Sequence, residues 1–218
     1  MKTLCVSLLL AICSTGVSAQ DVTARLAGRV PPDVAALVRQ LASSAAARGL
    51  PVEPLIQKAI EGSAKGVPPD RVAIALRGLV AQLDVAAAAL QETGPARPDT
   101  DAIGAGAFAL NAGLSGRQVT TLALASRASN SVAATLRVAS TLAAMGVPPA
   151  ETVELVTQVI EAGGSRKDVL ALPTQVMAGV SEGRGRGVTP AQAAAGLARA
   201  AAARANAPGQ QRPKHPHP

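Results

Sequence analysis

The chain has 218 residues, of which 48% are hydrophobic and 16% are charged, and alanine alone occurs 48 times. A hydrophobic fraction this high, with a formal net charge of only +7, excludes a wholly disordered chain and predicts a folded body of one or two domains. Trp and Tyr are absent and Phe occurs once, which excludes sites built on several aromatic rings.

Residues 1–19 have the form of a secretory signal peptide. Lys2 supplies a positive charge, an apolar stretch runs from Leu4 to Ile12, and small residues precede a cleavage site after Ala19. The apolar stretch is about half of the roughly 20 residues that a membrane-spanning helix needs. We therefore expect cleavage, no transmembrane span in the mature chain, and export to the periplasm or outside the cell. Both cysteines lie in this segment, so the mature chain has no thiol.

A short pattern of Gly, one apolar residue and then Pro or a hydroxyl residue recurs along the chain. It occurs at residues 28–31, Gly49-Leu50-Pro51, Gly66-Val67-Pro68, Gly113-Leu114-Ser115, Gly146-Val147-Pro148, Gly164-Ser165 and Gly187-Val188-Thr189-Pro190. The glycine suits a left-handed helix end, the apolar residue packs across the turn, and Pro, Ser or Thr suits the start of the next helix. Gly28, Gly49 and Gly66 lie 21 and 17 residues apart, which predicts one helix of about four turns between them.

Apolar residues between these turns recur with the spacing of a helix face. The stripes are Val34, Leu37, Val38 and Leu41; Val72, Leu76, Leu79, Leu83 and Leu90; Val132, Leu136 and Ala139; and Val153, Val156, Val159 and Ile160. No stretch alternates with the period of two that marks a strand. The sequence therefore predicts an all-α fold of short antiparallel helices joined by Gly-Val/Leu-Pro turns. The helices form either a helical-repeat, α-solenoid-like array or an irregular helical bundle, and the short regular intervals favour the array.

Breaks in the pattern predict how the chain is divided. A Gly- and Pro-rich linker at 93–101 separates an N-terminal helical lobe, 20–92, from a C-terminal helical lobe, 102–205. Residues 206–218 are rich in Pro and basic residues and are expected to be a disordered tail. Pro173 lies within an otherwise helical stretch and is expected to kink or split that helix.

Two short motifs match enzyme patterns but lack the required context. Residues 104–109 fit the nucleotide-binding pattern G-x-G-x-x-A, which needs a preceding strand, and here close helix packing is expected instead. Residues 179–183 fit the nucleophile pattern G-x-S-x-G, which needs a strand, a turn and a histidine base. The only histidines, His215 and His217, lie in the tail, so Ser181 is expected to end a helix. Neither a metal site nor a cofactor is predicted.

Glu61, Glu151 and Glu154 are the nearest candidates for carboxylate catalysis. Glu61 is four residues before Lys65, the spacing of an ion pair on a helix surface. Glu151 and Glu154 fall at a predicted helix start, where negative charge complements the helix dipole. Without Trp or Tyr to stack on a sugar ring, an enzyme acting on an envelope polymer is only the alternative hypothesis.

The C-terminal part of the chain is strongly basic. Six positive charges follow the last acid, Glu182, and they belong to Arg184, Arg186, Arg199, Arg204, Arg212 and Lys214. These residues are the candidate site for an anionic partner, such as an envelope polymer, a lipid surface or an acidic protein. No aromatic residues are interleaved with them, so base stacking is not possible and nucleic acid is not the expected partner.

Together these features predict an exported, non-catalytic helical-repeat protein. Helical arrays present extended surfaces, so we expect an interaction or scaffold module of the cell envelope or extracellular space. Its expected partner is another protein or an anionic envelope component. The alternatives are the envelope-polymer enzyme and an electrostatic binder that uses the basic C-terminal segment.

Overall fold

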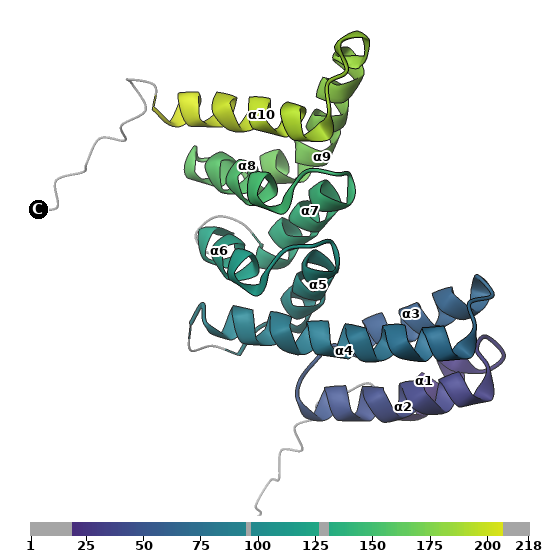
Figure 1. The fold of residues 1–218 in the computed structure, drawn as a ribbon. Helices are drawn as coiled ribbons and strands as arrows, with labels where there is room; N and C mark the ends of the chain where they lie inside the picture. Colours follow the sequence, from purple (N-terminus) through teal and green to yellow (C-terminus); the bar gives the residue numbers. More distant parts are fainter. Residues whose placement is uncertain (1–18, 95–96, 127–130, 207–218) are drawn as a thin grey trace, which may run out of the picture.

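The computed structural model describes residues 19–94, 97–126 and 131–206, and these residues form helices and no strand (Figure 1). The prediction of an all-α fold is confirmed. The helices are α1 (Ala19–Leu26), α2 (Pro32–Ala47), α3 (Glu53–Ala64), α4 (Pro69–Gln91), α5 (Thr100–Asn111), α6 (Gly116–Ser126), α7 (Val132–Ala144), α8 (Pro149–Glu161), α9 (Arg166–Glu182) and α10 (Pro190–Ala205), with a 3₁₀ helix at Arg184–Arg186. Residues 1–18 of the predicted signal peptide and 207–218 of the predicted tail lie outside the described residues.

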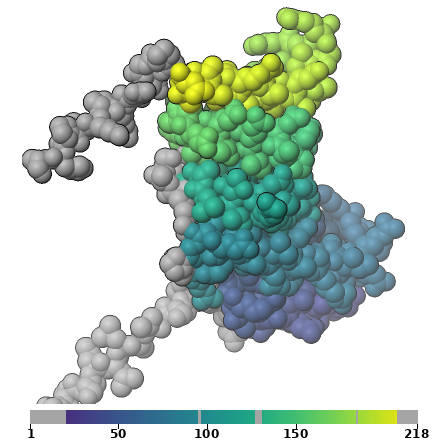
Figure 2. All heavy atoms as spheres, turned by 60° about the vertical axis from the view of Figure 1, so that its left-hand side comes forward, coloured from purple at the N-terminus to yellow at the C-terminus, as the bar shows by residue number. Residues whose placement is uncertain are grey.

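The helices stack in two rows. In the even-numbered row α2 packs on α4, α4 on α6, α6 on α8 and α8 on α10, while in the other row α5 packs on α7 and α7 on α9 (Figure 1). The space-filling view shows that the stack follows chain order, with α10 at the end opposite α2 (Figure 2). One hydrophobic core extends from Val22 in α1 to Ala198 in α10, so the residues of both predicted lobes share it.

Recurrent glycine turns make the short connections possible. At the end of α2, the N–H of Gly49 donates to Ala46 O at 2.9 Å and the N–H of Leu50 donates to Ala45 O at 2.9 Å. This pair of bonds is the Schellman arrangement, which satisfies carbonyl groups left free at a helix end. The same arrangement closes α3, α5, α7 and α8, and in each the glycine has a positive φ.

One turn differs from the predicted pattern in register. Gly163 has a φ of 80° and takes the left-handed position, whereas Gly164 occupies the place of the apolar residue. Ser165 is the N-cap as predicted, because its side chain accepts a hydrogen bond from the Asp168 N–H in a capping box.

Helix α4 forms the centre of the N-terminal part of the fold. Its predicted apolar stripe is confirmed, since Val72, Leu76, Leu79, Leu83 and Leu90 are all buried. The helix packs against α2, α3, α5 and α6. Within the described residues, α4 is also the one helix long and apolar enough to cross a membrane. Its packing against four helices is that of a core helix, which meets the same criterion.

The prediction that Pro173 splits a helix is wrong. Helix α9 runs without interruption from Arg166 to Glu182 with Pro173 inside it. Val169 and Leu172 before the proline and Val176 after it are buried. These contacts on both sides of Pro173 hold the helix together despite the missing backbone N–H.

Candidate functional site: the groove between α3 and α5

A groove opens where the odd-numbered row is interrupted. Among the described helices, α1 packs on α3 and α5 packs on α7, but α3 and α5 do not form a packed pair. The reason is the length of α4, which has 23 residues, whereas α3 and α5 have 12 each. Helix α3 packs on the beginning of α4 and α5 packs on its end, so the two neighbours are displaced along it.

Close contacts of three glycines locate this displacement. A Cβ placed on Gly62 of α3 would lie 2.9 Å from Val72 Cγ2, near the start of α4. A Cβ on Gly106 of α5 would lie 3.0 Å from Ala86 Cβ, near the end of α4. At Gly104 a Cβ would meet the rings of Pro51 and Pro54 at 3.9 Å, so α5 and the start of α3 touch there. Beyond this contact the two helices diverge.

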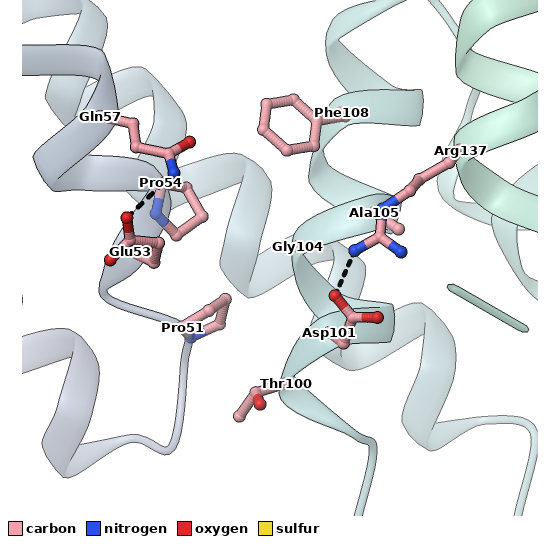
Figure 3. Close-up of a pocket in the computed structure, with 10 residues that line it drawn as sticks. All are labelled: Pro51, Glu53, Pro54, Gln57, Thr100, Asp101, Gly104, Ala105, Phe108 and Arg137. Atoms are coloured by element: carbon pink, nitrogen blue, oxygen red, sulfur yellow. Dashed lines mark hydrogen bonds and ion pairs between the residues drawn. The ribbon is translucent and has the colours of Figure 1, made fainter. Parts of the chain in front are cut away.

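We call the resulting depression the α3–α5 groove, and it consists of two adjoining hollows of about 310 and 340 Å³. One wall comes from the α3 side, the other from α5 with one residue of α7, and the floor is α4. The groove is lined by Pro51, Glu53, Pro54, Gln57, Lys58 and Glu61; by Ala75, Gly78, Leu79 and Gln82; and by Thr100, Asp101, Gly104, Ala105, Phe108, Asn111 and Arg137. Figure 3 shows part of both walls.

Phe108, the only aromatic residue of the chain, lies on the α5 wall. Its side chain faces Gln57 across the groove (Figure 3), and 47% of the residue is exposed. Single exposed apolar residues are common on protein surfaces, and Leu124 is an example here at 51% exposure. Phe108 differs because it lines both hollows, beside Pro54. A large, rigid apolar side chain in a depression is a typical anchor point for a partner.

The floor of the groove has room for an incoming chain. Ala75 and Gly78 of α4 line it with small side chains. A Cβ placed on Gly78 would have no atom within 4 Å, in contrast to the packed Gly106. Another segment can therefore approach the α4 backbone closely at this point.

Glu53 is held in an ion pair at the narrow end of the groove. Arg25 of α1 donates two hydrogen bonds to it, from Nη1 to Oε2 at 2.5 Å and from Nη2 to Oε1 at 2.6 Å. Gln57 Nε2 also donates to Oε1, at 2.9 Å (Figure 3). The hydrogen bonds from Arg25 hold the pKa of Glu53 below its usual range.

The other two carboxylates that line the groove are paired as well. Asp101 accepts a hydrogen bond from Arg137 of α7 (Figure 3). Glu61 accepts one from Lys65, as predicted from their spacing, and Lys58 Nζ lies 3.9 Å from it. The hydrogen bond from Lys65, with the charge of Lys58, lowers the pKa of Glu61. A general acid requires a raised pKa, so these pairs oppose acid catalysis by Glu53 or Glu61.

The other proposed catalytic residues lie away from the groove. Glu151 and Glu154 are on α8, which does not pack against α3, and Glu154 Oε1 accepts a hydrogen bond from Gln158 at 3.1 Å. Ser181 lies in the last turn of α9, as expected for a helix end. The G-x-G-x-x-A segment lies within α5, where the contact of Gly106 with α4 confirms close helix packing.

The six basic residues predicted to bind an anionic partner fall in three places: the 3₁₀ helix (Arg184 and Arg186), the second half of α10 (Arg199 and Arg204), and the part outside the described residues (Arg212 and Lys214). Arg199 and Arg204 donate from Nε to carbonyls of their own helix. Arg204 is 14 residues after Pro190, or about 21 Å along the helix, so the described members do not form one compact site.

The α3–α5 groove was not predicted from the sequence. The only signal was a face of α5 carrying Asp101, Gly104, Ala105 and Phe108 at helical spacing, with a lone aromatic residue among small ones. The spacing groups these residues on one face, but it cannot show that the neighbouring helix leaves that face open.

No known protein family matches the chain, and no curated protein or solved structure is similar to it. Function must therefore be inferred from the groove and the sequence features themselves.

Proposed function

We propose that the protein is an exported, non-catalytic interaction module of the cell envelope or extracellular space, and that its α3–α5 groove binds a partner protein. Export is supported by the signal-like segment that ends at Ala19. Val22 and Leu26 of α1 are buried in the core. Cleavage after Ala19 leaves both in the mature chain, so processing and folding are compatible.

The observation that carries the proposal is the half-exposed position of Phe108 in the groove. Protein interfaces have apolar, often aromatic, centres surrounded by polar rims. Pro54, Leu79 and Phe108 supply the apolar part here, and the amides of Gln57 and Asn111 line the edges. The ion-paired carboxylates favour binding over acid–base catalysis, because they are already neutralised and charged at neutral pH.

Site-specific cross-linking tests this proposal. Phe108 is replaced by photoreactive benzoylphenylalanine in the full-length protein, which is expressed and irradiated in its native cells. We expect a discrete protein adduct, because the new side chain keeps the ring of Phe108 in the groove. The matched control carries the same residue at Leu124 of α6, which is similarly exposed but outside the groove. Equal adducts at both positions, or none at position 108, would contradict the proposal.

A further inference from the structure

We infer that the occupant of the α3–α5 groove is an amphipathic α-helix of the partner protein whose buried face carries no charge. The inference rests on the proposed function and specifies what the groove binds.

The arrangement of the walls favours a helix over an extended peptide. Within the described residues every wall of the groove is helical, so no strand edge is available to pair with an incoming strand. The groove lies where two neighbours of the same row, α3 and α5, fail to pack, so an added helix would continue the packing seen elsewhere in that row. Asp101 to Asn111 on α5 spans about 15 Å, room for about three turns of helix.

The floor and the α5 wall fit the packing surface of a helix. Ala75 and Gly78 are one turn apart on α4, and the open space above Gly78 lets a second helix approach to the short end of the usual 8–10 Å range. Leu79 and Phe108 then provide larger apolar surfaces on either side of the crossing. The occupant meets them with apolar residues spaced three and four apart.

The charges of the groove favour an uncharged occupant. Glu53 is neutralised by Arg25, Asp101 by Arg137, and Glu61 by its two lysines, so no carboxylate in the groove lacks a cation. A charged residue buried here would lose its hydration without gaining an unpaired opposite charge. Gln57, Gln82 and Asn111 instead offer amide groups to polar, uncharged residues at the edge of the occupant.

The test uses a synthetic peptide with the sequence of the segment cross-linked to position 108. The peptide is labelled and titrated against the full mature protein by fluorescence anisotropy. We expect its dissociation constant to change less than about threefold between low and high salt, because no free charges pair across the interface. A proline placed in the middle of the peptide is expected to weaken binding at least tenfold, because proline breaks a helix.

A tenfold or greater weakening by salt, or equal binding of the proline variant, would overturn the inference while the cross-link still supports the proposed function. Attachment of position 108 to a glycan, a lipid or a second copy of this chain would overturn both. A Leu124→Ala variant of the protein serves as the control and is expected to bind the peptide like the wild type, because Leu124 lies outside the groove.

Discussion

Gly78 and Gly106 both lie inside helices but differ in what surrounds them. Gly78→Ala is expected to raise the free energy of unfolding by about 0.5–1 kcal/mol, because alanine favours the helix and its Cβ meets no atom within 4 Å. Gly106→Ala is expected to lower it by about 1 kcal/mol, because its Cβ would press on Ala86 of α4 at 3.0 Å. Denaturant titration measures both changes. A stabilising Gly106→Ala would show that α4 and α5 are less tightly packed than described.

Glu53 makes stability depend on acid pH. Its pKa is lowered in the folded protein by the hydrogen bonds from Arg25, so the ion pair contributes above the ordinary glutamate pKa of about 4.3. This contribution is lost as the pH falls through the folded pKa. Because the pair is exposed, Glu53→Gln should lower the free energy of unfolding at pH 7 by less than about 1 kcal/mol. Denaturant titrations at pH 7 and pH 3 check this, and a larger difference at pH 3 would contradict it.

Buried positions could be predicted from the sequence better than the exposed site. The spacing of Leu76 and Leu83 identified the buried face of α4, because every neighbour of that helix covers the same stripe. Phe108 could be assigned to a face of α5 but not to a groove. Whether that face is covered depends on the offset of α3 and α5 along α4, which no local pattern in either helix encodes.

Helix α9 tests how far packing can override an unfavourable residue. Pro173 removes one backbone hydrogen bond, and its ring crowds the carbonyl of Val169. Pro173→Ala is therefore expected to raise the free energy of unfolding by about 1–3 kcal/mol, as measured by denaturant titration. No gain would mean that α9 needs a bend at this position to pack on α7.

Turns and helix boundaries followed local chemistry closely, with one exception. The glycine turns at Gly49, Gly66, Gly113 and Gly146 were predicted because the left-handed conformation excludes most other residues. At Gly163-Gly164 either glycine satisfies that requirement, so the sequence could not decide the register. The continuity of α9 was missed because it depends on tertiary contacts on both sides of Pro173.

The whole molecule is a stack of helices in two rows with one interruption. The spacing of the glycine turns predicted helices of suitable length, and the packing of α4 with α6, α6 with α8 and α8 with α10 extends one row. The interruption arises because α4 is nearly as long as α3 and α5 together. The candidate binding site is thus a consequence of unequal helix lengths within a regular stack.

Filling the floor of the groove is the most direct test of whether it binds a partner. Gly78→Leu projects a side chain into the groove from an open position on α4, and Gly196→Leu does the same from an open position on α10, outside the groove. The measurement is the dissociation constant for the peptide cross-linked at position 108. We predict at least tenfold weaker binding for Gly78→Leu and a change of less than about twofold for Gly196→Leu. Equal affinities for the two variants would contradict a partner site in the α3–α5 groove.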